Sequence, residues 1–255
     1  MFKARLRAPA IAIAAIVFAS LLASPAQAAS TKYPLTVKFG GYTTKIVKKP
    51  TKIISLSPSA TEIFYAVGAG SQILAVDNLS NYPAGTPTSE ISAFEPNVEA
   101  ILAKKPDLVL LSIDATKAPQ IRNALVKLGI PVLMEKAPAT LNDVYAENTL
   151  LGRVTDRADG AAKLNAMMAK SIKDVLTKAK KSSKIRIFHE LDDTYYSVTS
   201  NTFIGKVYKD FGAVNIADAA SGADSSGYPQ LSAEYLLKSD PQVIFLADAQ
   251  YGTTA

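Results

Sequence analysis

The segment EYLLKSDPQVIFL, residues 234–246, repeats the pattern of EAILAKKPDLVLL, residues 99–111. Each begins with a glutamate, continues through apolar residues and a lysine-bearing turn, and has a proline seven residues after the glutamate. Each then ends in an unbroken apolar run, which is typical of a strand buried on both faces of a parallel sheet. The chain therefore contains one helix–strand unit twice.

Two further pairs of segments match in the same order. KIISL (52–56) corresponds to KIRIF (184–188), and a predicted helix ending at Gly68 corresponds to one over residues 203–211 that ends at Gly212. The second copy carries a longer insertion, ELDDTYYSVTSN (190–201). Three matches in one order predict two related α/β lobes.

Strands and helices alternate around the first copy. Before it, a Gly-Gly within alternating residues predicts a hairpin over 33–48. The first helix has two candidate N-terminal signals, Ser57 followed by Pro58, or Ser59 with Glu62 as a capping box. The predicted strands cover 52–56, 72–76, 107–111 and 130–134, and the predicted helices cover 57–68, 98–104, 119–128 and 141–151.

One long helix is predicted between the two copies, from Arg157 to Lys181. It carries a single apolar stripe at spacings of three and four residues: Ala161, Leu164, Met168, Ile172, Val175 and Ala179. A helix of this length spans about 35 Å. The resulting prediction is an α/β protein with a hairpin segment (29–50), a first lobe (51–156), a linking helix (157–181) and a second lobe (182–255).

The N-terminal residues have the pattern of a secretory signal peptide. Three basic residues precede the apolar stretch 8–23, and Ala26 and Ala28 form a small-x-small cleavage site. We expect residues 1–28 to be removed, which places the mature chain in the periplasm or another extracytoplasmic space. A retained membrane anchor is the alternative, although about 20 apolar residues are needed for a span.

Composition excludes several functional classes. Removing the signal peptide leaves 25 basic and 22 acidic residues, a net charge of +3 that is too low to indicate nucleic-acid binding. The chain has no cysteine, so it has no disulfide framework, no thiolate metal site and no lipid anchor on an N-terminal cysteine.

A matched cluster of residues precedes each copy of the repeated unit: Phe94, Pro96, Asn97 and Glu99 in the first, and Tyr228, Pro229, Ser232 and Glu234 in the second. Asn97 and Ser232 are the predicted N-caps. A glutamate two residues past a cap is favoured by the helix dipole, which is one explanation for both. The other is that Glu99 and Glu234 form a two-point docking face on the tips of the two lobes.

Four stretches carry a family resemblance: KIISLSPSATEIFYAVGAG, NLSNYPAGT, NVEAILAKKPDLVLL and GYPQLSAEYLLKSDPQVIFL. Together they resemble the substrate-binding proteins of ABC importers for cobalamin and ferric siderophores, over residues 51–248. The resemblance implies two Rossmann-like lobes joined by a rigid backbone helix around a shallow aromatic cleft. It also implies that Glu99 and Glu234 match the glutamates that pair with arginines of the permease dimer, whose ATPase subunits drive import.

The ligand is a metal chelate under this resemblance. Cobalamin binders of the family use cleft tryptophans, whereas this chain has none. Its arginines lie within or beside helices and strands, which fits an anionic ferric catecholate poorly. Asp77, Asp114, Glu190, Asp192 and Asp193 lie instead in candidate cleft loops, beside Tyr82, Tyr195 and Tyr196. A near-neutral corrinoid or ferric hydroxamate fits better, bound by Tyr82, Phe94, Asp114, Tyr195 and Tyr228.

Other functions remain as alternatives. His189 is the only histidine, which argues against a bare zinc or manganese site and leaves a buried strand-end residue or an axial ligand to a chelated metal. An exported serine hydrolase would use Ser57, and a third class is an adhesive or other non-transport binding module. We predict a monomer without catalytic residues, resident cofactor or metal.

The internal repeat also makes a prediction about the second lobe. After Leu111 the first lobe continues through a helix, a strand and another helix to Gly152, whereas nine residues follow Leu246. By this template the second lobe is incomplete, and a parallel sheet without its next crossover leaves an apolar face uncovered. We expect this lobe to be the less stable one.

Overall fold

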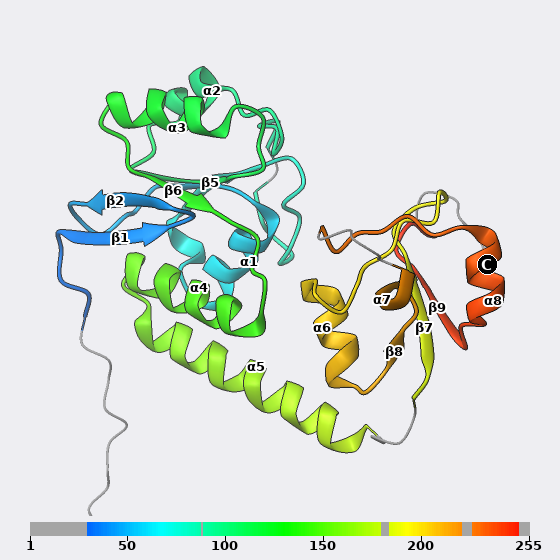
Figure 1. Cartoon of the computed structure of the whole chain (residues 1–255). Helices are drawn as coiled ribbons and strands as arrows, with labels where there is room; N and C mark the ends of the chain where they lie inside the picture. The colour runs from blue at the N-terminus through cyan, green and yellow to red at the C-terminus, as the bar shows by residue number, and fades with distance from the viewer. Residues whose placement is uncertain (1–29, 88, 180–183, 221–225, 250–255) are drawn as a thin grey trace, which may run out of the picture.

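The computed structural model describes residues 30–87, 89–179, 184–220 and 226–249. Two parallel sheets lie on either side of one long helix, α5, with helices packed around each sheet (Figure 1). The predicted α/β class with parallel sheets is confirmed. The predicted signal peptide lies outside the described residues.

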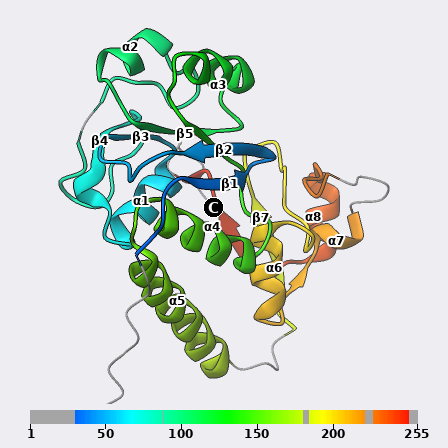
Figure 2. The ribbon, with the colours of Figure 1, turned by 90° about the vertical axis from the view of Figure 1, so that its left-hand side faces the viewer.

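The first sheet has the strand order β4-β3-β5-β6 and is parallel throughout. Its strands are β3 (Ile53–Leu56), β4 (Ile73–Val76), β5 (Leu108–Ser112) and β6 (Val132–Glu135). The helices between and after them are α1 (Pro58–Ala66), the short 3₁₀ turn η1 (Gly70–Gln72), α2 (Val98–Ala103), α3 (Ala118–Lys127) and α4 (Leu141–Val154). Helices α2 and α3 cover one face of the sheet, and α1 and α4 cover the other (Figures 1 and 2).

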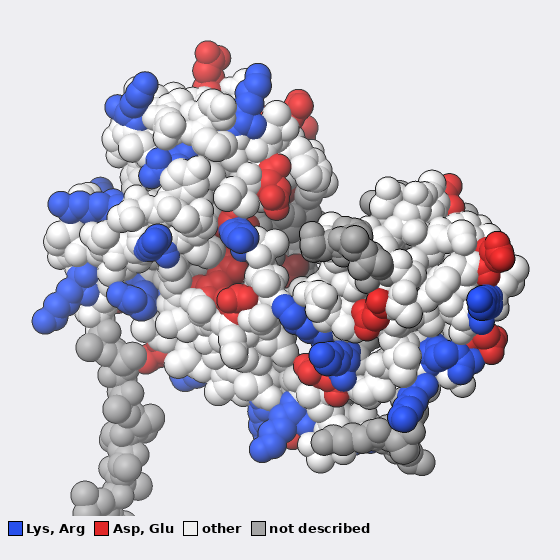
Figure 3. All heavy atoms as spheres, in the orientation of Figure 1, with Lys and Arg blue, Asp and Glu red and all other residues white. Residues whose placement is uncertain are grey.

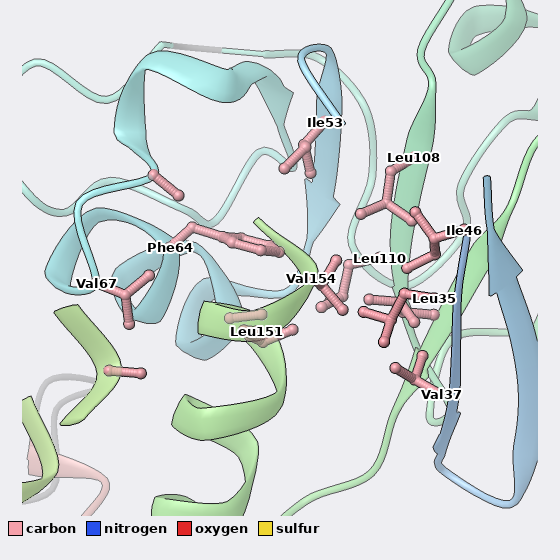
Figure 4. Close-up of a cluster of buried hydrophobic side chains, with 14 residues drawn as sticks. Leu35, Val37, Ile46, Ile53, Phe64, Val67, Leu108, Leu110, Leu151 and Val154 are labelled. Atoms are coloured by element: carbon pink, nitrogen blue, oxygen red, sulfur yellow. The ribbon is translucent and has the colours of Figure 1, made fainter. Parts of the chain in front are cut away.

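Each face of this sheet has its own hydrophobic core. Alternate residues of β5 divide between them, with Leu108 and Leu110 in one core and Val109 and Leu111 in the other. Figure 4 shows the core on the side of α1 and α4, where Phe64 and Leu151 pack against the strands. Burial on both faces explains why these strands are continuous apolar runs in the sequence.

The N-terminal hairpin packs on this lobe. Its strands are β1 (Leu35–Phe39) and β2 (Tyr42–Ile46), joined by Gly40 and Gly41 with positive φ. The buried Thr44 hydroxyl donates to the Val132 carbonyl, 2.6 Å away, and ties β2 to β6. A side chain at Gly40 would overlap the Met134 carbonyl, so this close approach requires glycine. The predicted hairpin is confirmed.

Helix α5 (Ala158–Lys178) connects the two sheets. Its first turns are fixed to the first lobe, because Gly160 lies against the Val67 carbonyl and the Arg157 Nε donates to the Gly68 carbonyl over 2.7 Å. Ala161 is the only residue of the predicted stripe that is fully buried, and Val175 is exposed. The stripe was predicted correctly in position, but the second half of it is not covered by the described residues.

The second sheet has the order β8-β7-β9 and is also parallel. Its strands are β7 (Arg186–Glu190), β8 (Val214–Asn215) and β9 (Val243–Leu246), and its helices are α6 (Phe203–Asp210), α7 (Ala217–Ala220) and α8 (Ala233–Ser239). Strand β9 stands beside β7 as β5 stands beside β3, and β8 takes the place of β4. The two copies found in the sequence therefore have the same topology.

The turns of the two repeated units match in detail. Lys105 and Asp240 both have left-handed backbone angles directly after the helices α2 and α8. Two residues later, Asp107 accepts hydrogen bonds from the Thr51 and Lys52 amides, and the Gln242 side chain accepts one from the Arg186 amide. In each lobe this polar side chain fixes the start of the central strand.

The equivalent strands β5 and β9 of the two repeats differ in burial, since β5 lies between β3 and β6 and β9 lies at the edge of its sheet. The β5 residues from Leu108 to Leu111 are fully buried, whereas Val243, Ile244 and Phe245 of β9 are 37%, 50% and 40% exposed. Two apolar hollows, lined largely by α5, α6 and the second sheet, lie beside this surface. None of the described residues covers this apolar face, as was expected for the second lobe. That a further crossover belongs there stays a prediction.

Candidate functional site

The predicted ligand-binding residues of the first lobe lie on adjoining loops at the carboxyl ends of its strands. Tyr82 and Phe94 belong to the loop after β4, and both side chains are exposed. Asp114 lies in the loop after β5, and this loop is joined to Phe94 by a 2.6 Å hydrogen bond from the Thr116 amide to the Phe94 carbonyl. Carboxyl ends of parallel strands are the usual location of ligands in open α/β sheets.

The second lobe brings Tyr195 and Tyr228 onto neighbouring segments. The Leu231 amide donates to the Tyr195 carbonyl over 3.0 Å, and the Ser197 amide donates to the Pro229 carbonyl over 2.9 Å. Both tyrosine side chains remain partly exposed. The five predicted residues therefore form two groups, one on the loops of each lobe. A notch separates the two bodies in the surface view (Figure 3).

The two predicted docking glutamates occupy equivalent positions. Asn97 caps α2 by accepting from the Ala100 amide, and Ser232 caps α8 by accepting from the Tyr235 amide, so both predicted N-caps are confirmed. Glu99 and Glu234 lie in the first turns of these helices with exposed side chains. Both carboxylates are therefore accessible to a partner protein. Their role in docking stays a prediction.

A pair of buried glutamates lies at the carboxyl end of the first sheet. Glu135 ends β6 and is 4% exposed, and Glu147 on the inner face of α4 is 5% exposed. The Ser59 hydroxyl donates to the Oε1 atom of Glu135 over 2.8 Å. Burial, the nearby Glu135 carboxylate and a hydrogen bond to it raise the pKa of Glu147 to about 8. At neutral pH the pair therefore shares one proton and carries a single negative charge.

A chain of buried hydroxyls supports this end of the sheet. The Thr61 hydroxyl donates to the Ser55 hydroxyl over 2.9 Å and contacts the Ser80 hydroxyl, which donates to Asp77. Asp77 also accepts from the Leu79 and Ser80 amides and is 1% exposed. The prediction that Asp77 lies among the cleft carboxylates is therefore wrong, because its carboxylate is used to hold the loop that follows β4.

The geometry of Ser57 does not support a hydrolase. Ser57 is the N-cap of α1 and contacts the Ser59 hydroxyl over 3.0 Å, so the alternative capping box at Ser59 and Glu62 is wrong. His189, the only histidine in the chain, lies on β7 of the other lobe and pairs through Nδ1 with the Tyr208 hydroxyl over 2.8 Å. Ser57 therefore lacks the neighbouring base that a serine nucleophile requires.

His189 is a buried strand residue. Its ring lies among Tyr208 and Phe245, and burial lowers its pKa, so it is neutral at physiological pH. The Tyr208 ring beside it belongs to α6. The next residue, Glu190, is also buried, and burial together with Asp248, Asp192 and Asp193 raises its pKa. Among the described residues no cluster of three or more potential metal ligands occurs.

Sequence interpretation missed the Glu135–Glu147 pair, although two signals pointed to it. Glu135 directly follows the apolar run IPVLM, so it continues a buried strand. Glu147 falls between Val144 and Leu151 at spacings of three and four residues, so it lies on the apolar face of α4. A glutamate in each of two apolar patterns is uncommon, because ionised carboxylates are rarely buried without a partner.

Comparison with known proteins gives a consistent result. The pattern of a family described as periplasmic binding protein matches residues 53–254. The uncharacterized ABC transporter substrate-binding lipoprotein YvrC of Bacillus subtilis is 30% identical over 237 residues, covering 88% of this chain and 73% of the relative. A vitamin B12-binding protein of Vibrio cholerae is 30% identical over 213 residues, covering 81% and 75%. The crystal structure of a possible iron-binding periplasmic solute-binding protein from Staphylococcus epidermidis superposes with a TM-score of 0.68 at 26% identity, covering 79% of this chain and 78% of that one.

Proposed function

This chain belongs to the periplasmic binding protein family, and we propose that it captures a metal chelate between its two lobes and delivers it to the permease of an ABC importer. The observation that carries the proposal is the presence of exposed aromatic side chains on loops of both lobes, Tyr82 with Phe94 on one and Tyr195 with Tyr228 on the other. Exposed rings on two rigid lobes provide flat apolar surfaces for the faces of a macrocycle or chelate.

The ligand class is a cobalamin-type corrinoid or a ferric siderophore. The names of the relatives support both, since one is a vitamin B12-binding protein and another a possible iron-binding protein. The candidate cleft loops carry the exposed carboxylates of Asp114 and Asp193 and the half-buried carboxylate of Asp192. An acidic surround disfavours a strongly anionic catecholate and favours a near-neutral corrinoid or ferric hydroxamate.

Binding is tested by titrating the mature chain with cyanocobalamin and with a ferric hydroxamate while following tyrosine fluorescence. Tyr228→Ala and Phe94→Ala should each weaken binding by about five- to tenfold, because a ring contact contributes about 1 kcal/mol beyond its buried area. Leu237→Ala, an exposed apolar position on α8, is the control and should bind as the wild type does. Unchanged affinity in both aromatic variants would show that the rings do not contact the ligand. If neither chelate binds, a non-transport binding module is favoured instead.

Delivery requires a permease dimer and its ATPase subunits as partners. We propose that Glu99 and Glu234, on equivalent helices of the two lobes, contact basic residues of the two permease subunits. The double variant Glu99→Ala/Glu234→Ala should keep full ligand affinity and lose stimulation of ATP hydrolysis by the reconstituted transporter. Glu95→Ala changes an exposed carboxylate in the adjacent loop and should leave stimulation intact. Undiminished stimulation by the double variant would contradict this assignment.

The proposed location is the periplasm or another extracytoplasmic space, reached through a cleavable signal peptide over residues 1–28. The Bacillus subtilis relative is named as a lipoprotein. Among the described residues, no helix is long and apolar enough to span a membrane. Mass spectrometry of the protein recovered from its source should give a mature N-terminus at Ala29. A protein that retains residues 1–28 would contradict cleavage.

A further inference from the structure

The Glu135–Glu147 pair adjoins a cavity that the proposed chelate site does not use. The cavity measures about 410 Å³ and lies between the hairpin, the loop after β6 and helix α4. Glu147 forms part of its wall, and Glu135, at the end of β6, interacts with Glu147 but does not line the cavity. The remaining lining is Lys38, Phe39, Lys136, Ala137, Pro138, Ala139, Asp143, Ala146 and Leu150. A volume of this size lies within the range of small-molecule sites, about 300 to 1,000 Å³.

Apart from the contact within the pair, one oxygen of the pair receives no hydrogen bond from a third residue among those described. The Oε1 atom of Glu147 is buried and accepts no hydrogen bond from the described residues. Buried polar atoms are normally paired, so an unpaired acceptor at the wall of a cavity calls for a donor. The pair holds one negative charge even when it shares a proton, which favours a donor that is itself positively charged.

The walls of the cavity indicate what kind of cation fits. Phe39, Pro138 and Leu150, with three alanines, make the lining largely apolar around the acidic wall. A metal ion needs several converging oxygen ligands, and the described residues contain no cluster of three or more acidic, histidine or cysteine side chains. An alkylammonium group meets both conditions, because its N–H donors fit carboxylate oxygens and its carbon chain fits apolar walls.

We propose that this cavity is a binding site for a small primary ammonium compound, whose –NH₃⁺ group donates hydrogen bonds to the buried Glu147 carboxylate in the cavity wall. When the ammonium group binds, the carboxyl proton of Glu147 is released to solvent, and the resulting carboxylate accepts hydrogen bonds from the ammonium group. The ammonium group belongs either to a separate amine or to the transported ligand itself.

The charged groups around the pair set its pH response. Ser59 on α1 donates to Glu135, Asp143 on α4 lies at the cavity rim beside the cation of Lys206, and Lys38 and Lys136 extend from the hairpin and the β6 loop. Because the pKa of Glu147 is raised to about 8, its carboxyl group is protonated at neutral pH, and a bound amine must displace this proton. Amine affinity should therefore rise about tenfold per pH unit from pH 6 to 8 and become constant above it. An alkylammonium ion stays protonated throughout this range, since its pKa resembles that of lysine.

The test is titration calorimetry of the mature chain with n-butylammonium chloride, in two buffers of different ionisation enthalpy. The wild type should bind saturably at pH 7 and release close to one proton per amine. Glu147→Gln should lose at least tenfold in affinity and release no proton, and Ala146→Phe, which fills the cavity while leaving the acid pair in place, should also prevent binding. Glu62→Gln, an exposed carboxylate on α1, should behave as the wild type does. Circular dichroism checks that each variant is folded.

Several outcomes would overturn the proposal: no saturable binding, equal binding by Glu147→Gln or Ala146→Phe, or binding without proton release. Equal binding of tetramethylammonium, which has no N–H donor, would show that only non-specific charge attraction operates. A chelate titration with and without saturating amine then identifies the source of the ammonium group. Competition would assign it to the transported ligand, and independent binding would assign it to a separate amine. Because amine binding is measured without chelate, it can fail or succeed independently of the proposed transport function.

Discussion

Replacing Glu147 by glutamine is expected to change how the stability of the first lobe depends on pH. Burial and the neighbouring Glu135 raise the pKa of Glu147 to about 8 in the native protein, from an ordinary value of 4.5. Between these two values the native protein holds a proton that the unfolded chain has released. The free energy of unfolding therefore falls as the pH rises. The stability linked to this proton is fully present below pH 4.5 and is lost as the pH approaches about 8.

The size of the effect follows from the interval between the two pKa values. Each pH unit corresponds to about 1.4 kcal/mol, so the whole interval amounts to at most about 5 kcal/mol. Glutamine has the same shape and can donate its amide N–H to Glu135, but it does not titrate in this range. Relative to the wild type, the variant should gain about 1.4 kcal/mol in free energy of unfolding for each unit between pH 5 and 8.

The measurement must report on the first lobe alone, because two lobes can unfold separately. Hydrogen-exchange protection of the fully buried β5 residues, corrected for the intrinsic exchange rate at each pH, gives the free energy of opening of this lobe. Glu62→Gln, which removes an exposed carboxylate from α1, is the matched control and should follow the wild-type profile. Parallel pH profiles for Glu147→Gln and the wild type would refute the conclusion that Glu147 is protonated in the native state.

Three further predictions concern packing and hydrogen bonding. Gly160→Ala should destabilise the protein by about 1 to 3 kcal/mol in urea unfolding, because the added methyl group overlaps the Val67 carbonyl and pushes α5 from α1. Thr61→Val should cost a similar amount, about 1 to 3 kcal/mol, since it removes a buried hydroxyl that hydrogen-bonds the Ser55 and Ser80 hydroxyls. Amides of β9 should exchange faster than those of β5, given the exposure of the β9 side chains. Equal protection of the two strands would show that the second sheet is as stable as the first.

The repeated unit could be predicted from sequence because all its signals are local. In each copy the cap, the helical spacing, the proline and the apolar run lie within 15 residues, and each specifies its own element. The relationship between the two lobes followed from the repeat, since two copies of one unit are expected to share one topology. The N-caps Asn97 and Ser232 were identified for the same reason, because a side-chain cap bonds an amide three residues away.

Features that depend on contacts between elements were harder to predict. The periodicity of α5 identifies the side on which Val175 and Ile172 lie, but it does not state whether another element covers that side. Asp77 had the same appearance in the sequence as an exposed loop carboxylate such as Asp114, and only the fold places Ser80 and two amides around it. The pairing of Glu135 with Ser59 joins positions 76 residues apart, so no local pattern could reveal it.

Under the proposed function, residues that occur in both lobes and residues that occur in one lobe have different roles. Glu99 and Glu234 occur in both copies of the unit and occupy equivalent helix termini. A partner made of two like subunits requires such matched contacts, because each subunit presents the same surface. The acid pair of Glu135 and Glu147 lies on β6 and α4, for which the second lobe has no counterpart among its described residues, and Tyr195 lies in the insertion of the second copy alone. A chelate has different groups on its different sides, so its recognition benefits from lobes that differ. The matched glutamates of the two lobes therefore fit docking to a symmetric transporter, and the residues that only one lobe carries fit discrimination between the two sides of a ligand.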